Sequence, residues 1–117
     1  MADLNTALVA VHWDPEEVLQ LSPWSCASTT KEGRPCPGAL NAARAPQILI
    51  ALSTLVRDRP TTPAAAAAET NVLWAMACRC LCADHHGAVS ALVALWAERL
   101  EEARRLADLA AATLLRV

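Results

Sequence analysis

The sequence predicts a mainly α-helical fold: a small helical domain with a two-stranded hairpin that is clamped by a cluster of cysteine and histidine side chains. Two observations lead to this prediction. Apolar residues recur at helical spacing through most of the chain, and segments rich in Pro, Gly and Thr separate these stretches. Cysteines stand near both ends of one such segment, and further cysteines precede a pair of histidines later in the chain.

The composition fits one domain with a modest core. Hydrophobic residues make up 55% of the 117 residues, but Phe and Tyr are absent and much of that share is alanine, which buries little area. We expect a single domain over residues 1–117, divided into an N-terminal arm (1–13), a stabilised core (14–104) and the end of the C-terminal helix (105–117). A cross-link would add usefully to the stability of such a core.

The charge and hydropathy patterns exclude several classes of protein. The net charge of −2 argues against a protein that binds nucleic acid mainly through electrostatics. No apolar run approaches the ~20 residues that span a bilayer, and the start of the chain lacks the basic region of a signal peptide. We therefore expect a soluble protein without membrane contacts, inside the cell that produces it or inside a host cell.

The first predicted helix is short. It is expected to begin at Pro15, because Asp14 can cap the helix and proline suits the first helical position. It should end by Leu21, because Pro23 follows. The arm before this helix ends in Trp13, which we expect to contribute an apolar contact surface for a partner.

The next segment, residues 24–37, predicts the hairpin. Its tip is expected within residues 29–34, with Gly33 at a positive φ angle. Cys26 and Cys36, separated by nine residues, would then face one another near the open end.

Three longer helices are expected after the hairpin, over residues 39–59, 63–83 and 88–115. The second should begin at Pro63 with Thr62 as its cap. The first carries an apolar stripe that consists of Ile48, Leu49, Leu52, Leu55 and Val56.

The last predicted helix carries a heptad-like seam that consists of Val89, Val93, Trp96, Leu100, Ala103, Ala107, Ala110 and Leu114. Glu101 and Arg105 are expected to pair on its outer face. Packing of the seam on the protein's own core is the interpretation we favour. Docking of its C-terminal half on a partner, or on a second copy to form a dimer, is the alternative.

Cysteine and histidine spacing predicts a zinc site. Structural zinc takes four nitrogen or sulfur ligands in a tetrahedron. Cys26 and Cys36 supply one pair, and Cys82 and His86, which are four positions apart, could share one helical face and supply the other. Such a site would join the hairpin to the junction of the last two helices.

Other assignments of these side chains stay open. Cys78 could replace Cys82, and His85 competes with His86, whereas Cys80 is expected to be a buried small hydrophobe. Five free thiols, or a disulfide between the two hairpin cysteines, are the competing interpretations. The odd number of cysteines, together with the nearby histidines, favours the metal.

No catalytic motif accompanies the proposed site. The sequence lacks the His-x-Glu and Pro-Cys-x-x-Cys pattern of zinc deaminases, a Gly-rich phosphate loop and a Gly-x-Ser-x-Gly motif. We therefore expect a protein that is not an enzyme.

The segment from Cys26 to Cys36 resembles the Cys, Thr-Lys-x-Gly, x-x-Cys opening of a small fungal cysteine-rich domain. That domain continues with a Leu-rich helix, a Leu-Cys-x-x-x-His motif and a helix with a Trp, which match residues 49–52, 81–86 and 93–96. The resemblance covers about residues 24–98. It implies a zinc site whose ligands are Cys26, Cys36, Cys82 and His86.

In that family the domain stands alone or precedes a GIY-YIG nuclease domain. The resemblance does not imply nuclease activity, because the catalytic domain needs tyrosines and this chain has none. The layout is also similar, more weakly, to zinc-finger-fold effectors of plant-pathogenic fungi.

We therefore expect a non-catalytic, zinc-stabilised protein–protein interaction module, of which a fungal effector that binds a host protein is one version. The alternative is a zinc module that binds nucleic acid as an accessory to a nuclease or regulator. In that case Lys31 and Arg34 at the hairpin tip would contact phosphate.

Overall fold

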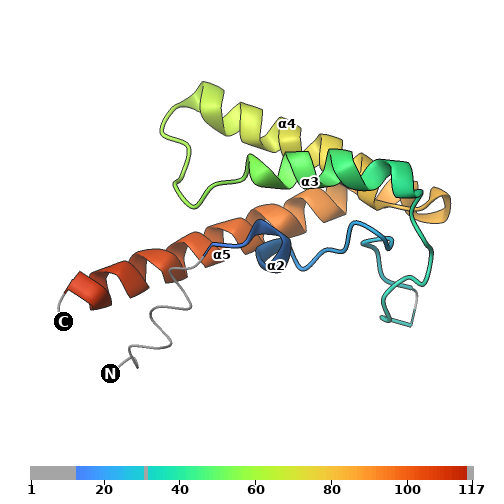
Figure 1. Ribbon diagram of the computed structural model, residues 1–117, viewed down its shortest axis with the longest axis horizontal. Helices are drawn as coiled ribbons and strands as arrows, with labels where there is room; N and C mark the ends of the chain where they lie inside the picture. Colours follow the sequence, from blue (N-terminus) through green and yellow to red (C-terminus); the bar gives the residue numbers. More distant parts are fainter. Residues whose placement is uncertain (1–12, 31, 116–117) are drawn as a thin grey trace.

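The predicted mainly α-helical class is confirmed (Figure 1). This computed structural model describes residues 13–30 and 32–115, so most of the expected N-terminal arm and Lys31 lie outside the described residues. Within these ranges the α-helices are α2 (Pro15–Leu19), α3 (Ala45–Ser53), α4 (Pro63–Cys80) and α5 (Val89–Leu115). Two short 3-10 helices, η1 (Ala42–Arg44) and η2 (Ala83–Ala88), precede α3 and α5 respectively.

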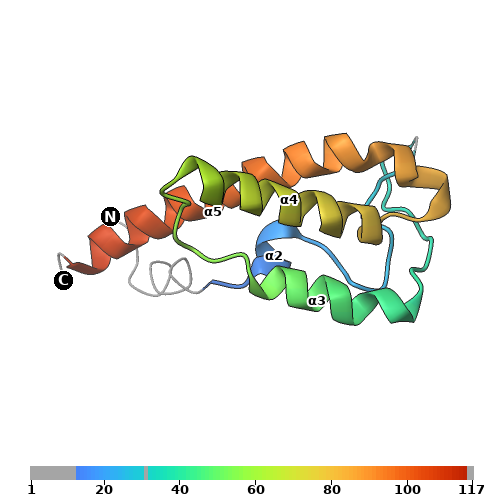
Figure 2. The same cartoon turned by 90° about the horizontal axis from the view of Figure 1, so that it is seen from above.

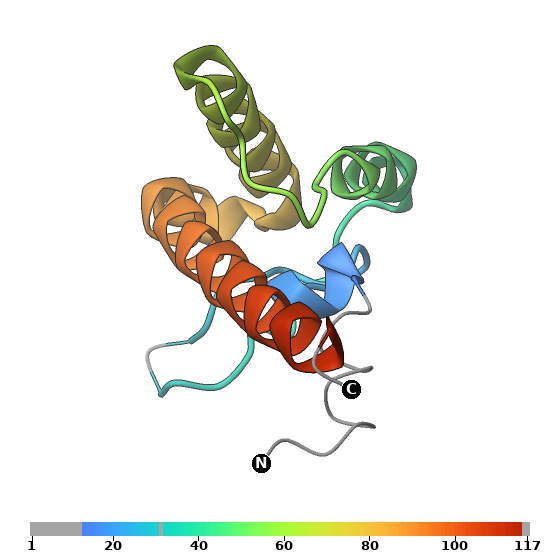
Figure 3. The ribbon, with the colours of Figure 1, turned by 90° about the vertical axis from the view of Figure 1, so that its left-hand side faces the viewer.

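The helices pack around one core. Helix α4 runs antiparallel to both α3 and α5, and α5 extends well past the end of the bundle (Figure 2). The short α2 contacts α5 and α3, which closes the arrangement on the side opposite α4 (Figure 3). The core contains Trp96, Met76 and Ile48, all almost completely inaccessible to solvent. Within the described part of the chain, no helix is long and apolar enough to cross a membrane.

Local capping signals place the starts of α2 and α4 where the sequence predicts them. The Asp14 side chain accepts a hydrogen bond from the Glu16 backbone N–H, and the Thr62 side chain accepts one from Ala65. Proline follows each cap, at a position where its missing N–H costs nothing. Helix α2 ends at Leu19 because Gln20 adopts a left-handed conformation with φ 54°.

Helix α3 is shorter than the predicted helix over residues 39–59. Its end at Ser53 has a local cause: the Ser53 hydroxyl donates to the Ile50 carbonyl, and the Thr54 hydroxyl donates to the Ala51 carbonyl. Such side-chain bonds compete with continuation of the helix. Only part of the predicted apolar stripe, Ile48, Leu52 and Leu55, is buried. The prediction for Leu49, which lies within α3, and for Val56, which follows it, is wrong because both side chains are exposed.

The heptad-like seam of α5 is buried, as the favoured interpretation predicts. It buries Val93, Trp96 and Leu100 against the bundle, and Ala107 and Ala110 are also buried. From Val89 to Leu100 the seam is therefore part of the protein's own core. Docking of its C-terminal half on a partner or a second copy stays a prediction.

The predicted Glu101–Arg105 pair is wrong. Arg105 instead binds Glu102, three residues earlier, at 2.6 Å. Glu101 binds Arg59 of the α3–α4 linker at 3.0 Å, and Arg59 also binds Asp108. The guanidinium of Arg59, from a separate segment, therefore binds Glu101, the residue that helical spacing predicts as the partner of Arg105.

Trp13 packs partly on the bundle. Its indole N–H donates to the Leu55 carbonyl at 2.8 Å, and its side chain is half-buried. The buried Arg104 guanidinium lies 6.0 Å from the centre of its ring and binds both carboxylate oxygens of Glu69, at 2.9 and 2.7 Å. Trp13 thus joins the first helix to the α3–α4 linker.

The predicted two-stranded hairpin is not formed. In its place, two isolated antiparallel bridges, Ser25–Ala39 and Thr29–Pro35, hold the loop over residues 24–40 closed. Backbone hydrogen bonds still cross the loop, from Cys26 to Gly38, from Cys36 to Ser28 and from Thr30 to Arg34, and Pro35 and Pro37 fall at the positions between them. The predicted turn is confirmed, since Gly33 has φ 79° and donates to the Thr30 carbonyl.

Candidate metal centre

Three thiols and one imidazole converge where the loop meets the α4–α5 junction. Cys26, Cys36, Cys82 and His85 each offer one ligand atom, and all four atoms lie within 4.8 Å of one another. The first two cysteines are buried, and the other two side chains are half-buried. The cluster therefore sits at the margin of the core, where it joins two segments that are distant in the sequence.

Backbone hydrogen bonds across the loop place the first two cysteines diagonally across from one another. The Cys26 N–H donates to the Gly38 carbonyl and the Cys36 N–H donates to the Ser28 carbonyl, both at 2.9 Å. The Ala27 N–H then donates to the Cys80 carbonyl at 2.7 Å, which attaches the loop to the end of α4.

The second pair of ligands comes from a tight turn after α4. Cys82 caps η2, and the His85 backbone N–H donates to the Cys82 carbonyl at 3.0 Å. This turn brings His85 Nδ1 to 3.2 Å from Cys82 Sγ and 3.8 Å from Cys26 Sγ. The Arg44 guanidinium donates to the carbonyls of Arg79 and Leu81, so it fixes the chain immediately before Cys82.

The structure gathers His85, and not the predicted His86, with the three cysteines. The prediction assumed α-helical geometry, in which residues four apart share a face. The segment is a 3-10 helix, in which residues three apart are eclipsed, so the side chain three positions after Cys82 turns back toward it. His86 is exposed and lies outside the cluster.

The two additional cysteines of α4 are not part of the cluster. Cys78 is exposed on the helix surface, so it does not replace Cys82. Cys80 is completely buried, which confirms its prediction as a small hydrophobe, and burial raises the pKa of its thiol to about 12. This thiol therefore stays protonated at neutral pH.

Backbone N–H groups point at the sulfur atoms of the cluster. Cys26 Sγ accepts from the Cys82 N–H at 3.2 Å, and Cys36 Sγ accepts from the Gly38 N–H at 3.4 Å. The backbone N–H of Ser28 likewise donates to Cys26 Sγ, and that of Asp84 donates to Cys82 Sγ. Each sulfur thus accepts from the N–H two residues further along the chain. Such donors stabilise the thiolate form, which is the form that binds metal.

Opposing effects act on the thiol pKa values. Burial raises the pKa of Cys26, although its backbone donors oppose this shift. The hydrogen bond with His85 lowers the pKa of Cys82 to about 7. At neutral pH the site therefore already holds substantial thiolate character at Cys82.

Gly38 gives the cluster the space that it needs. A Cβ atom at this position would lie 3.3 Å from Cys36 Sγ and 3.4 Å from both Cβ and Sγ of Cys82. Gly38 is not among the predicted site residues, although its position two residues after Cys36 is a usable signal.

All five cysteines are free thiols. Cys36 Sγ and Cys82 Sγ are 3.9 Å apart, far beyond the disulfide bond length of about 2.05 Å. The disulfide interpretation is therefore wrong for this structure. Three sulfur atoms and one nitrogen atom at these separations could together bind a metal ion.

Of the remaining predicted contact residues, Arg34 lies at the tip of the loop, two residues before Cys36. Arg34 is exposed there, its backbone N–H bonds the Thr30 side chain, and its carbonyl accepts from the Thr30 N–H. Lys31 lies outside the described residues.

No family model, curated protein or solved structure matches the chain. Any function assigned to the protein therefore depends on the cluster and on the surfaces around it. The resemblance to the small fungal cysteine-rich domain stays a prediction that depends on the motifs in residues 26–36 and 81–86.

Proposed function

We propose that this chain is a non-catalytic, zinc-stabilised module that binds another protein. The observation that carries the proposal is the convergence of four protein ligand atoms, three sulfurs and one nitrogen, within 4.8 Å. A fungal effector that acts on a host protein is one version of this function.

The separations of the ligand atoms suit zinc. With Zn–S of about 2.3 Å and Zn–N of about 2.05 Å, a tetrahedral site has edges of about 3.8 Å between sulfurs and about 3.6 Å between sulfur and nitrogen. The observed Cys36–Cys82 edge is 3.9 Å, two of the three edges from His85 to sulfur are 3.2 and 3.8 Å, and all edges are within 4.8 Å. Thiolates and imidazole also favour zinc over the hard cations magnesium and calcium.

The number of ligands supports a structural role for the metal. Catalytic zinc sites generally use three protein ligands and leave the fourth position to water or substrate. Here Cys26, Cys36, Cys82 and His85 fill all four positions of a tetrahedron. A zinc ion held by this set has no open position at which to activate water.

Zinc would join the loop to the α4–α5 junction and stabilise the fold. Structural zinc contributes about 10–16 kcal/mol in small zinc-binding peptides, whereas a domain has a net stability of only about 5–15 kcal/mol. Alanine-rich helices bury little area per residue, so we expect folding of this chain to depend on the metal.

Exposed apolar side chains support a protein partner. Leu49 and Ile50 are neighbours on the outer surface of α3, and Leu106 and Leu109 lie three residues apart on one face of α5. Trp24, in the loop next to the metal centre, is 58% exposed. Apolar groups of this size on a surface fit contact with another protein better than contact with a phosphate backbone.

A matched pair of histidine variants tests the metal site. His85→Ala should lower zinc affinity by more than about 100-fold, because even changes next to metal ligands cost about 10–100-fold. His86→Ala is the control and should bind zinc as the parent does. Native mass spectrometry and chelator competition measure both variants. Equal zinc affinity of the two variants would refute the ligand assignment.

Salt dependence separates the two kinds of partner. A nucleic-acid module should bind a fluorescent DNA or RNA duplex with an affinity that falls steeply between low and moderate salt. The protein-binding function predicts no measurable binding of either duplex by the zinc-loaded protein at moderate salt. Tight, salt-sensitive duplex binding that is lost in Arg34→Ala would overturn it.

A further inference from the structure

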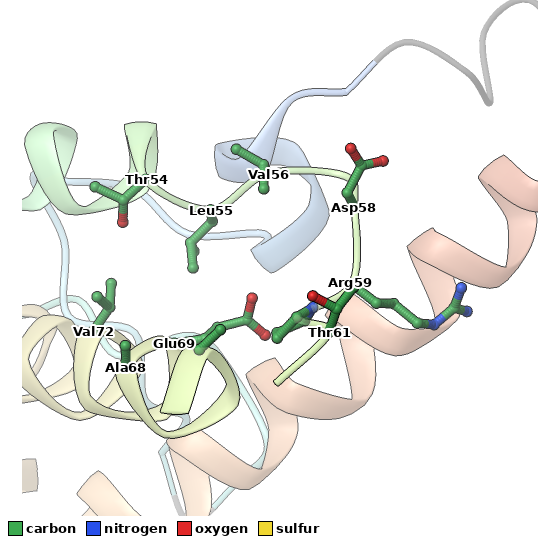
Figure 4. Close-up of a pocket in the computed structure, with 11 residues that line it drawn as sticks. Thr54, Leu55, Val56, Asp58, Arg59, Thr61, Ala68, Glu69 and Val72 are labelled. Carbon is green, nitrogen blue, oxygen red and sulfur yellow. The ribbon is translucent and has the colours of Figure 1, made fainter. Parts of the chain in front are cut away.

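A second concave site lies between the end of α3, the linker that follows it and the N-terminal half of α4 (Figure 4). Its volume is about 420 Å³, within the range of about 300–1,000 Å³ that small-molecule sites occupy. It shares no residue with the metal centre. The linker side presents aliphatic side chains beside polar and charged ones, and Leu55 projects into the space from above in Figure 4.

The linker wall of this cleft is fixed at three points. The Leu55 carbonyl accepts from the Trp13 indole at 2.8 Å, and the Val56 carbonyl accepts from Arg104 at 2.9 Å. The Arg59 guanidinium bonds both carboxylate oxygens of Glu101. These anchors hold the linker in place over α4, so the cleft is formed before any ligand arrives.

The opposite wall is one face of α4, where small side chains leave the space open. Ala65, Ala68 and Val72 occupy neighbouring positions on that face. Any larger residue at Ala65 or Ala68 would project into the cleft. Both alanines are exposed, so their side chains line this space without contributing to the buried core.

The polar groups of the cleft determine the charge that a ligand can carry. The Glu69 carboxylate extends from α4 into the space below the linker, while the Arg59 side chain turns away toward α5 (Figure 4). Each Glu69 oxygen accepts one hydrogen bond from Arg104 and can accept another. Asp58 adds a second carboxylate at the rim. The cleft therefore offers acceptors and disfavours anions.

We propose that this cleft binds a small, neutral, largely apolar molecule whose single hydrogen-bond donor reaches the Glu69 carboxylate. The aliphatic side chains of the two walls, Leu55, Val56, Pro60, Ala65, Ala68 and Val72, take the body of the ligand. The Glu69–Arg104 pair orients its polar group. The proposal does not depend on the metal, because the cleft and the cluster involve different residues.

Two dyes with the same aromatic frame test the chemistry. N-phenyl-naphthylamine is neutral, apolar and carries one N–H donor, whereas anilinonaphthalene sulfonate adds a negative charge to that frame. The zinc-loaded protein should enhance the fluorescence of the neutral dye in a saturable titration, with affinity roughly tenfold or more above that of the sulfonate. No enhancement, or equal affinity for both dyes, would overturn the proposal.

A matched pair of variants tests the location. Ala68→Phe places a ring in the cleft and should weaken binding of the neutral dye by roughly tenfold or more. Ala67→Phe makes the same change on α4 at an exposed position outside the lining and should bind the dye as the parent does. Circular dichroism verifies that both variants fold. Unchanged binding by Ala68→Phe, or an equal loss in both variants, would refute the site.

Discussion

Replacement of Gly38 by alanine is a direct test of how tightly the cluster is packed. The added Cβ would lie 3.3 Å from Cys36 Sγ and 3.4 Å from Cys82 Sγ. Optimal contacts between heavy atoms lie at about 3.5–4.0 Å, so the sulfur atoms would have to move by a few tenths of an ångström. Gly38 does not have a positive φ angle, so the backbone itself accepts alanine.

Two opposing effects set the magnitude. Alanine restricts the unfolded chain and stabilises a compatible site by about 0.4–1 kcal/mol. Overpacking costs about 1–3 kcal/mol, and we take about 1–2 kcal/mol because the overlap is small. In the metal-free protein the thiols can rotate away from the new Cβ, so the first effect dominates. With metal bound the sulfurs are fixed, so zinc affinity should fall by the overpacking cost, roughly 5- to 30-fold.

Chelator competition measures zinc affinity, and thermal unfolding of the metal-free and zinc-loaded forms measures stability. Gly87→Ala is the matched control, because a Cβ at Gly87 meets no atom within 4 Å. It should leave zinc affinity unchanged and stabilise the fold by about 0.4–1 kcal/mol. If Gly38→Ala binds zinc as tightly as Gly87→Ala does, the sulfur atoms are not held at these positions and the packing argument fails.

Two further predictions concern the same site. Arg44→Met keeps an apolar stem but removes the hydrogen bonds to the two carbonyls before Cys82. Zinc affinity, measured by chelator competition, should therefore fall about 10- to 100-fold. An unchanged affinity would show that Arg44 does not position this ligand. Because the pKa of Cys82 is about 7, this thiol holds its proton at pH 6 and has released it at pH 8. At pH 6 protons compete with the metal, so zinc affinity should be weaker than at pH 8. Calorimetry in buffers of different ionisation enthalpy should detect the protons that are released on zinc binding. A zinc affinity that does not change with pH would contradict thiolate ligation.

Several elements could be predicted from the sequence because their causes are local. Asp14 and Thr62 each precede a proline, and a cap followed by proline specifies a helix start without any tertiary contact. Gly33 marks the turn for a similar reason, since a positive φ angle suits glycine. The buried seam of α5 follows from the spacing of its apolar residues.

Other features escaped prediction because distant residues decide them. Arg59 binds Glu101 from a separate segment and so displaces the pair expected within the helix. Trp13 and Arg104, which are distant in the sequence, help to hold the linker that forms one wall of the cleft beside Glu69. A local sequence pattern cannot predict these contacts, because the residues that form them are far apart in the chain.

The candidate metal centre shows most clearly which features follow from the sequence and which depend on the tertiary structure. The sequence by itself predicted that Cys26 and Cys36 should meet Cys82 or Cys78, because soft ligands at two well-separated positions suit one tetrahedral site. Only the tertiary structure decided between these two cysteines and between the adjacent histidines. The loop bonds to the end of α4, and the chain after it tightens into a 3-10 turn. That geometry aligns residues three apart, so it directs His85 inward and leaves His86 in solvent.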